Sequence, residues 1–471
     1  MTETEIKKNE KNIGYSNKKF AAYGIGQTSD ITALLTFTFL VFTFYFTVVG
    51  LPVLLISIGF IIWSLWNSFN DIFIGYLSDR THTKWGRRLP YIMIALIPLG
   101  IVTFLLFTPP ITFGITEQSA NFVYFIIIII IFEFVFTLYD LNFTALFPEL
   151  FIDLKERTKA NVFRQSFLIV GLFMAFIIPG LFISDYSDPN SLAQYQMFGI
   201  IIALIIIIPG LIFLRFAPRE KAEFREDYKN APSFYGSLKM CAKSKAFKWY
   251  IPAEIAVWFV YTMLVTIVPL YGKFVLGITD TLILSLLLAL TFISAFICMN
   301  ILWRPLVQKI GPRKSWLISL IIFIAMILPL MFIQDAISGL IVFFLIGIGL
   351  SGSIYIVDIV ISDIIDDDEV RTGARREGGY YGVNMFLMRL SAVLVFLSIS
   401  LVFTNVGWAV YEPEKVTSEI IFGLRVLMFV FPAIALTVAI LVLYKYPLDN
   451  ERLREVKDKL QKIHKDKKSK I

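Results

Sequence analysis

The stretch Phe122-Val-Tyr-Phe-Ile-Ile-Ile-Ile-Ile-Ile-Phe-Glu-Phe-Val-Phe136 decides the fold, because it carries one charged residue among aliphatic and aromatic side chains. A helix that crosses the hydrocarbon core of a bilayer needs about 20 mostly apolar residues. This run and its apolar flanks reach that length, and a comparable run extends from Phe198 to Leu214. Such runs recur along the chain, so the sequence predicts a membrane protein with many spanning helices.

The composition of the 471 residues supports the same prediction. Apolar residues make up 57% of the chain, charged residues make up 17%, and the mean hydropathy is +0.74. Soluble domains contain about 45–50% apolar and about 25% charged residues. The apolar excess excludes a soluble enzyme, and the 45 Phe and 20 Tyr residues exclude a disordered chain.

Few residues suit catalysis or metal binding. The only histidines are His82 and His464, which argues against a histidine-based metal site and against Ser-His or Cys-His catalysis. The only cysteines, Cys241 and Cys298, fall in a polar loop and in an apolar segment, which argues against a structural disulfide. We therefore expect no enzymatic activity, no catalytic residues, no metal site and no cofactor. The polar N-terminus also lacks the short apolar core of a removable signal peptide.

Hydropathy predicts twelve spanning helices. They cover 20–48, 53–78, 89–109, 120–148, 160–184, 193–216, 247–275, 280–303, 315–335, 337–365, 378–404 and 418–444. The longest polar break, 217–246, divides them six plus six. The expected architecture is an all-α membrane protein with two six-helix bundles. They occupy 20–216 and 247–444, joined by a cytoplasmic linker at 217–246 and flanked by cytoplasmic tails at 1–19 and 445–471.

Lys and Arg residues gather on one side of the predicted membrane. The segments that hold 39 of the 43 basic residues are 1–19, 79–88, 150–165, 215–248, 304–314, 371–376 and 445–471. Positively charged loops face the cytoplasm, so both termini are predicted to be cytoplasmic and the protein to lie in the cell membrane. The net charge of +7 follows from this topology, and nucleic acid is not an expected partner.

Two short basic turns are similar to each other. The second span is followed by Gly75-Tyr-Leu-Ser-Asp-Arg-Thr-His-Thr-Lys-Trp-Gly-Arg-Arg88. The eighth span is followed by Leu306-Val-Gln-Lys-Ile-Gly-Pro-Arg-Lys314. Each contains a glycine followed by basic residues. Equivalent turns in two six-span halves indicate parallel repeats related by an axis along the membrane normal.

Ionisable residues inside the predicted spans are the main functional candidates, since a charged group is costly to bury in a bilayer. They are Asp30, Asp71, Glu133, Asp140, Glu254, Asp358 and Arg389, with Arg164 and Asp363 nearer the ends of spans. One interpretation is that they form buried ion pairs that only hold helices together. The acids outnumber the bases, however, which favours a polar path for a solute, a proton or a cation.

The same residue types suit several ligands. A carboxyl group in a low-dielectric cavity exchanges a proton as the cavity opens to either side, and two acids with carbonyl oxygens hold sodium. Carboxylates accept hydrogen bonds from sugar hydroxyls, and arginine donates them. An aromatic ring stacks on the apolar face of a sugar, and Trp66, one turn from Asn70, is a candidate. The alternative for any such ring is packing against lipid or helices.

The 75–88 turn resembles the cytoplasmic signature of the major facilitator superfamily, Gly-x-Leu-x-Asp-Arg followed by Gly-Arg-Arg. Nearly the whole chain resembles the glycoside–pentoside–hexuronide:cation symporter family, which includes melibiose permease. The stretches that carry this resemblance are Tyr23-Gly-Ile-Gly26 with Asp30, Trp66-Asn-Ser-Phe-Asn-Asp-Ile-Phe-Ile-Gly75, Tyr139-Asp140 with Pro148, Glu156-Arg-Thr158 leading to Phe163-Arg164, and Asp363 to Gly382.

The resemblance implies a V-shaped pair of six-helix bundles around one central site, which works by alternating access. It also implies roles for individual residues. Asp30, Asp140 and Arg164 match the family's sugar-binding positions. Asp71 matches a carboxylate of the cation site, and Arg389 matches a basic residue close to that site.

The chain departs from this family pattern at the cation site. The second acid of the melibiose-type site is replaced by Asn67, which retains an oxygen but not the negative charge. Asp71 is left as a lone carboxylate at these positions. A lone carboxylate favours coupling to a proton over coupling to sodium.

The sugar site departs from the family pattern as well. Thr144 replaces the stacking tryptophan, and Ser29 and Ser64 replace two basic residues, so the galactoside site is not reproduced. Glu254 and Asp358 are not family positions. They are candidates to supply replacement polarity, or the missing acid, if they face the cavity.

Four residues of the 75–88 turn are predicted to act in gating: Asp79, Arg80, Arg87 and Arg88. A carboxylate there caps a neighbouring helix N-terminus and pairs with arginine in the outward-facing state, then releases it. The alternative is a basic loop that only sets the topology.

The sequence therefore predicts cation-coupled symport of a sugar, glycoside or sugar acid by alternating access, with a proton favoured over sodium. The alternative is a carrier of lipids, lysolipids or other amphipathic solutes, which a side opening toward lipid would favour. A receptor that only signals is disfavoured, because no cytoplasmic segment is long enough for a signalling domain. The expected partners are a small solute, a co-transported H⁺ or Na⁺ and membrane lipid, and the protein is expected to be a monomer.

Overall fold

The computed structural model describes residues 15–79, 81, 83–151, 154–219, 234–372 and 377–469. Within these ranges the chain is helical, and its β-structure is limited to one isolated bridge, Thr83 to Gly86. In the described part of the chain, eleven helical segments are long and apolar enough to cross a membrane, and a twelfth, the 17-residue α5, is shorter. Each of the twelve predicted spans corresponds to one of these segments, so the all-α membrane architecture is confirmed.

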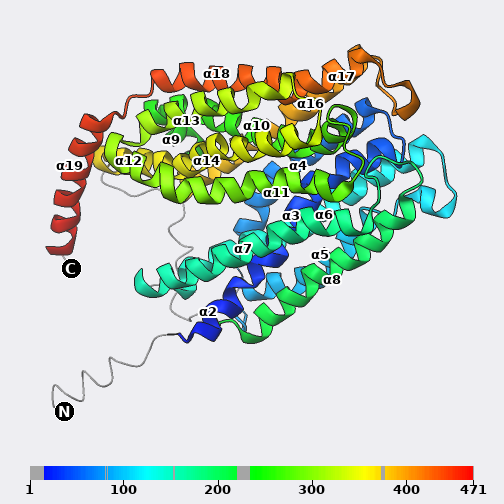
Figure 1. Cartoon of the computed structure of the whole chain (residues 1–471). Coiled ribbons are helices and arrows are strands. Elements are labelled where there is room, and N and C mark those ends of the chain that lie inside the picture. The colour runs from blue at the N-terminus through cyan, green and yellow to red at the C-terminus, as the bar shows by residue number, and fades with distance from the viewer. Residues whose placement is uncertain are drawn as a thin grey trace.

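The helices of the N-terminal half are α2 (Asn17–Gly24), α3 (Gly26–Thr47), α4 (Val53–Asp79), α5 (Leu89–Leu105), α6 (Gln118–Leu150), α7 (Leu154–Phe182) and α8 (Leu192–Phe216). Those of the C-terminal half are α9 (Phe234–Lys243), α10 (Lys245–Phe274), α11 (Thr281–Cys298), α12 (Arg304–Ile310), α13 (Pro312–Ile327), α14 (Ala336–Thr372), α15 (Glu377–Met388), α16 (Leu390–Asn405), α17 (Ser418–Arg425), α18 (Phe431–Tyr444) and α19 (Asn450–Ser469). The two halves lie side by side in Figure 1, and they meet where α3 packs on α10, α4 on α16 and α7 on α11.

Two helices lie in segments for which the sequence predicted only a polar linker and a polar tail. They are α9, within 217–246, and α19, within 445–471. The apolar residues Leu453 and Val456 give α19 a buried face. This helix packs on α14, where Arg452 lies 3.8 Å from Asp367 and Lys457 lies 3.5 Å from Asp363. The hydropathy pattern did not indicate this helix, because a short amphipathic helix needs no long apolar run.

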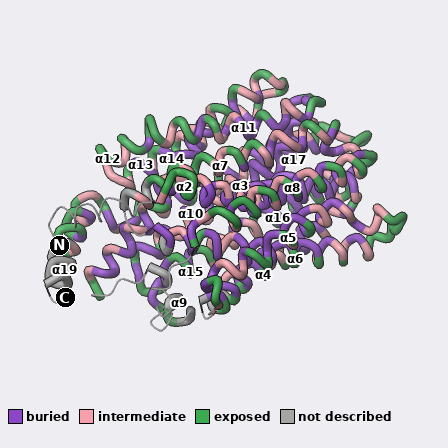
Figure 2. The backbone as a smooth tube through the Cα atoms, turned by 90° about the horizontal axis from the view of Figure 1, so that it is seen from below, coloured by how far each residue is buried: buried purple, intermediate pink, exposed green. Residues whose placement is uncertain are grey.

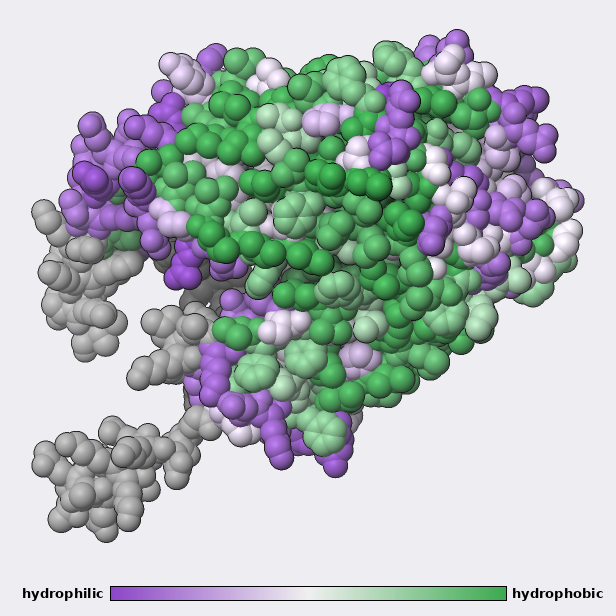
Figure 3. Space-filling view, viewed as in Figure 1, coloured by the Kyte–Doolittle hydropathy of each residue, from purple (hydrophilic) through white to green (hydrophobic). Residues whose placement is uncertain are grey.

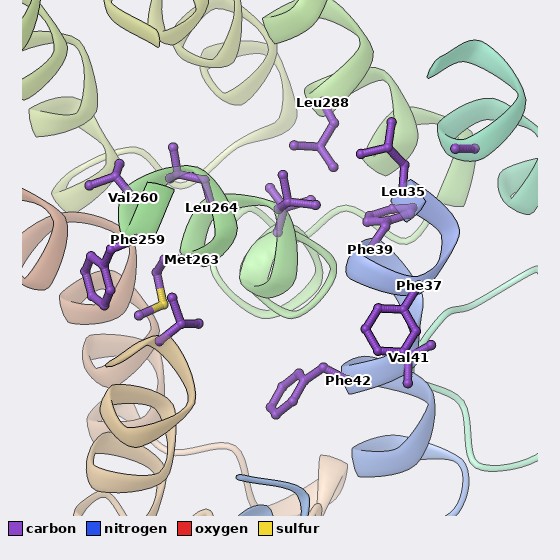
Figure 4. Packing of buried hydrophobic residues seen from close by; sticks show 14 of the residues in the cluster. Leu35, Phe37, Phe39, Val41, Phe42, Phe259, Val260, Met263, Leu264 and Leu288 are labelled. Atoms are coloured by element: carbon purple, nitrogen blue, oxygen red, sulfur yellow. The ribbon is translucent and has the colours of Figure 1, made fainter. Parts of the chain in front are cut away.

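The central helices are buried on all sides, as expected for helices without a polar face. In α3, the large side chains of Phe37, Phe39 and Phe42 are at most 2% exposed, and α10 contributes Val260 and Met263 to the same cluster. Figure 4 shows Phe37, Phe39 and Phe42 on α3 and Val260 and Met263 on the neighbouring α10, with Val260 on the side of α10 turned away from α3. Buried residues fill the interior of the molecule in Figure 2, while exposed residues follow its outer edges.

The outward faces of the spans are apolar. Large aliphatic side chains are exposed on outer helices, including Ile94 on α5, Leu181 on α7, Ile321 on α13 and Leu441 on α18. In Figure 3 hydrophobic residues cover the middle of the surface, and hydrophilic residues gather toward its two ends. This distribution fits a protein whose middle lies in the hydrocarbon core of a bilayer.

Polar contacts join the two halves near the loops that follow α7, α10 and α16. Lys273 Nζ lies 2.6 Å from Asp185 Oδ2, and the Tyr186 hydroxyl lies 2.7 Å from that of Ser285. The hydroxyl of Tyr411 donates to the Ser187 carbonyl oxygen at 2.6 Å. Burial raises the pKa of Tyr411 to about 12, so this donor keeps its proton at physiological pH.

The two similar basic turns share one backbone feature. Gly86 and Gly311 both have positive φ, 112° and 84°, a conformation that residues with a side chain rarely adopt. The Gly311 turn also holds α19, because Asn450 Nδ2 donates to the Ile310 carbonyl oxygen at 2.8 Å. A Cβ at Gly311 would collide with the Asn450 side chain.

Replacing Gly311 with alanine is therefore expected to lower the free energy of unfolding by about 1–2 kcal/mol. The strained φ and the collision with Asn450 act in the same direction. Thermal unfolding of the purified protein measures the change. Gly382→Ala is the matched control, because a Cβ on that helical glycine meets open space and should be neutral or slightly stabilising. An equal loss of stability in both variants would contradict the explanation.

Candidate functional site

A central cavity of about 530 Å³ lies between the two halves. Helices α3, α4, α6, α10, α11, α14, α15 and α16 contribute to its walls, together with the short break between α15 and α16. Its polar lining residues include Asp140, Glu254, Asp358, Asn384 and Arg389. Aromatic rings line much of the remaining wall, among them Phe37, Trp63, Trp258, Tyr261 and Tyr381. The cavity thus combines carboxylates with apolar ring faces.

An ion pair joins the halves beside this cavity. Arg389 Nη2 donates to Asp71 Oδ2 at 2.9 Å, and each side chain is about 20% exposed. Arg389 occupies the break between α15 and α16, where Ser64 of α4 donates to its carbonyl oxygen at 2.7 Å. The structure therefore brings together two residues that the sequence assigned to one site from spans two and eleven.

Asn67 lies one turn before Asp71 on α4 and is fully buried. Among the described residues, neither the nitrogen nor the oxygen of its side-chain amide has a hydrogen-bond partner. The amide oxygen of Asn70, which is 1% exposed, is likewise without a partner in the described part of the chain. Unsatisfied buried polar atoms are rare and costly, so this face of α4 is suited to a bound water or cation.

Helix α6 brings a second carboxylate to the ion pair. The Thr137 hydroxyl lies 3.2 Å from Asp71 Oδ1 and 3.4 Å from Glu133 Oε1. Glu133 is 2% exposed, and the indole nitrogen of Trp63 donates to its Oε2 at 2.8 Å. The sequence noted Glu133 as an intramembrane acid but gave it no role. The spacing of four between Glu133 and Thr137, which places both on one helix face, was the available signal.

The predicted sugar-site residues Asp30 and Arg164 are joined through a glutamine that the sequence analysis did not select. Gln27 Nε2 donates to Asp30 Oδ2 at 2.6 Å, and Arg164 Nε donates to Gln27 Oε1 at 2.5 Å. The carboxyl groups of Asp30 and Asp140 are close enough to hydrogen-bond when one carries a proton. Of these residues only Asp140 lines the central cavity, and the others lie behind it.

The tryptophan chosen from the sequence lies elsewhere. Trp66 is 37% exposed and is not among the residues that line the cavity. Trp63, one turn earlier on α4, lines it instead and packs at 5.1 Å between ring centroids against Phe37.

Glu254 and Asp358 both line the cavity, as does Asn384 of α15. Asn384 Nδ2 donates to Glu254 Oε1 at 2.9 Å. Glu254 Oε2 and Asn384 Oδ1 are buried without hydrogen-bond partners among the described residues. Since both of these atoms are acceptors, this wall of the cavity is suited to a ligand that donates hydrogen bonds.

The four gating candidates are only partly described. The side chain of Asp79 and the whole of Arg80 lie outside the described residues. Arg87 and Arg88 are buried, and Arg88 Nη1 donates to the Ser78 hydroxyl at 2.6 Å. No group of three or more His, Cys, Asp or Glu side chains that could hold a metal occurs among the described residues.

Comparison with known proteins identifies relatives of this chain. The family model described as MFS/sugar transport protein matches residues 22–450. An uncharacterized symporter of Synechocystis is 24% identical, over 93% of this chain and 96% of that protein. The sodium-dependent lysophosphatidylcholine symporter 1 of Mus musculus is 21% identical over 85% of this chain and 80% of its own. The isoprimeverose transporter of Lactiplantibacillus pentosus is 23% identical over 74% of this chain and 73% of its own.

The fold has solved counterparts. A variant of the nucleoside transporter NupG superposes with a TM-score of 0.66 at 12% identity, covering 92% of this chain and 100% of that structure. A bacterial homolog of the lysosomal transporter Spinster superposes with a TM-score of 0.63 at 14% identity, covering 92% and 98%. These likenesses establish the helical arrangement as that of membrane transporters.

Proposed function

We propose that this chain, which belongs to the MFS/sugar transport protein family, is a proton-coupled symporter of a neutral sugar or glycoside. The family is one of transporters and not of enzymes. Alternating access would carry the solute across the cell membrane, with both termini on the cytoplasmic side as the distribution of basic residues predicts. The observation that carries the proposal is the central cavity, where carboxylates and aromatic rings meet beside the Asp71–Arg389 ion pair.

The charge of the cavity supports a neutral solute. Three carboxylates, those of Asp140, Glu254 and Asp358, line it, while its Arg389 is already paired with Asp71. Carboxylates accept hydrogen bonds from hydroxyl groups and repel anions. A sugar acid, which the sequence left open, is therefore disfavoured relative to an uncharged sugar.

The aromatic walls supply the complementary surface. Trp258, Tyr261 and Tyr381 line the cavity near Glu254 and Asn384 in the C-terminal half. Aromatic faces are apolar surfaces on which the C–H groups of a sugar ring pack. We assign substrate binding to Asp140, with Asp30 and Arg164 holding it in place through Gln27, and to Glu254, Asp358 and Asn384 on the opposite wall.

Coupling is assigned to the cluster around the Asp71–Arg389 ion pair, with Asn67 on the same face of α4 and Glu133 connected to Asp71 through Thr137. Sodium is bound by several hard oxygen ligands, usually with more than one negative charge, and Asn67 lacks the charge of an acid. Glu133 brings a second carboxylate near Asp71, but Arg389 offsets one of the two negative charges. The single net charge that remains suits one proton, so proton coupling is favoured. Gating is assigned to the basic turn with Asp79, Arg80, Arg87 and Arg88, which would pair and release as the halves rock.

Replacing Glu254 with glutamine is expected to lower the affinity for a neutral glycoside by about tenfold to a hundredfold. The variant replaces a buried charged acceptor with a neutral amide, and hydrogen bonds to charged groups are worth about 1.5–3 kcal/mol. The affinity for a glucuronide should rise relative to the affinity for a neutral glycoside. Ligand-dependent thermal stabilisation measures both effects, and Glu414→Gln, on an exposed loop, is the matched control. Unchanged selectivity would remove Glu254 from the substrate site.

A lysolipid carrier remains the second candidate, because a specific cavity favours it. An apolar cavity of about 320 Å³ lies between α7 and α11 and shares Phe292 and Ile354 with the central cavity. Exposed side chains such as Phe173 and Phe296 line it, so it faces the lipid. An acyl chain would fit such a side opening.

A thermal-shift panel on the detergent-purified protein separates the two candidates. The compounds are isoprimeverose, lactose, sulfoquinovose, a glucuronide and lysophosphatidylcholine, each with and without sodium at two pH values. Stabilisation by a neutral sugar, stronger at low pH and indifferent to sodium, supports the proposal. Stabilisation by lysophosphatidylcholine alone would move the lipid carrier to first place.

A further inference from the structure

We propose that Glu133, rather than Asp71, is the group that takes up and releases the coupling proton, and that the Trp63 indole N–H links it to the solute cavity. The inference rests on the proposed symport function. It assigns Asp71 a structural and electrostatic role as the partner of Arg389. The proton step is the reversible conversion of one carboxylate and one proton into a carboxylic acid.

The hydrogen-bond partners of the two carboxylates differ. Asp71 contacts the guanidinium of Arg389 at 2.9 Å, so its charge is balanced and protonation would break an ion pair. The hydrogen-bond donors to the Glu133 carboxylate are neutral: the Trp63 indole at 2.8 Å and, more weakly at 3.4 Å, the Thr137 hydroxyl. No basic side chain of the described residues hydrogen-bonds to Glu133. A buried carboxylate without a contacting counter-ion is the one that gains most from accepting a proton.

The groups facing Glu133 define its electrostatic surroundings. The charged side chains that act on it are Arg389 from the α15–α16 break, Asp71 from α4 and Asp140 from its own helix. Because Arg389 is shared with Asp71, this cluster has more acids than bases. A cluster with a net negative charge can bind one monovalent cation without becoming positively charged. A proton on Glu133 is such a cation.

Unsatisfied amide atoms beside the acids indicate a ligand there. Both atoms of the Asn67 amide are fully buried without a hydrogen-bond partner among the described residues. Asn70 donates to the Glu133 carbonyl oxygen at 3.3 Å, while its own amide oxygen has no partner in the described part of the chain. Water or a hydrated proton at this face of α4 would satisfy these atoms. Thr137, between Asp71 and Glu133, completes a polar connection from the ion pair to Glu133.

Trp63 connects this site to the solute. One part of its side chain lines the central cavity, and its indole nitrogen donates to Glu133 at 2.8 Å. The donor stabilises the ionised form of Glu133, since hydrogen bonds to a charged acceptor are about twice as strong as neutral ones. A solute that packs on the ring and turns the indole away withdraws this donor, and Glu133 then takes up a proton. Linkage requires the reciprocal effect: protonated Glu133 frees Trp63 for the solute.

Infrared difference spectroscopy tests the assignment without any solute. The full-length protein in detergent is titrated with protons alone, and the C=O stretch of protonated carboxyl groups is followed. The wild-type protein should gain a carboxyl band on acidification that Glu133→Gln lacks. Glu117→Gln, an exposed position just before the same helix, should retain the band. A band that persists in Glu133→Gln but disappears in Asp71→Asn would overturn the proposal.

Trp63→Phe tests the link to the cavity, and it remains informative if Glu133→Gln fails to fold. Loss of the N–H donor with retention of an aromatic ring should move the titration midpoint of the same band to higher pH by about one unit. An unchanged midpoint would contradict the linking role.

In proteoliposomes, Glu133→Gln should retain solute exchange while solute-driven proton movement falls at least about tenfold. If wild-type vesicles move no proton with any solute, the proposed symport fails, whatever the titration shows.

Discussion

Replacing Asp140 with asparagine is expected to lower solute affinity at least about a hundredfold, a loss of about 2.7 kcal/mol of binding free energy. Asp140 is the acid of the N-terminal half that lines the cavity, and its carboxyl group also faces that of Asp30. The substitution removes a charged acceptor for solute hydroxyls and disturbs the Asp30–Gln27–Arg164 chain behind it. Ligand-dependent thermal stabilisation with isoprimeverose or lactose measures the loss.

The control for this variant is Asp458→Asn, which makes the same chemical change on the exposed side of α19. It should bind the solute like the wild-type protein. The unfolding temperature without ligand shows whether Asp140→Asn is folded. Wild-type affinity in a folded Asp140→Asn variant would exclude this carboxylate from the solute site.

Replacing Asp71 with asparagine is expected to abolish proton-driven accumulation while solute exchange continues. The variant leaves Arg389 buried without its ion-pair partner, so the free energy of unfolding should also fall by about 3–5 kcal/mol. Arg389→Gln should destabilise the protein for the converse reason, since Asp71 and Glu133 then lack a nearby base.

The double variant Asp71→Asn with Arg389→Gln distinguishes an ion pair from two independent contributions. Because it removes both charges, its stability should recover most of the loss seen in each single variant. Thermal unfolding of the four proteins completes the cycle. Additive losses of unfolding free energy would show that Asp71 and Arg389 do not act as a pair. Proton-coupled accumulation of solute in Asp71→Asn would contradict their part in coupling.

The spanning architecture could be predicted almost completely from hydropathy. Every predicted span has a helical counterpart, since bilayer thickness sets one length scale for apolar runs. The pairing of Asp71 with Arg389 could be anticipated as well, because isolated charges in spans are costly and seek partners. Hydropathy did not indicate the helices in the polar segments, where α9 and α19 form without any long apolar run.

The candidate site was harder to predict, because its neutral members carry no electrostatic signal. Gln27, Thr137 and Asn384 are polar but uncharged, so nothing in the sequence distinguishes them from other polar residues in spans. The choice between Trp63 and Trp66 depended on which side of α4 faces the cavity. Apolar residues occupy all sides of this helix, since one faces the protein and another the lipid, and periodicity alone does not separate them.

The most direct test of the account is proton movement driven by a neutral sugar. The purified full-length protein is reconstituted into vesicles that contain a pH-sensitive dye, and an inward gradient of isoprimeverose or lactose is imposed without a pH gradient. Proton-coupled symport predicts acidification of the lumen with at least one of these sugars, unaffected by sodium and absent in Asp71→Asn. Proton-coupled sugar symport would be contradicted if the lumen stayed at constant pH while the sugar entered. It would also be contradicted if lysophosphatidylcholine alone entered.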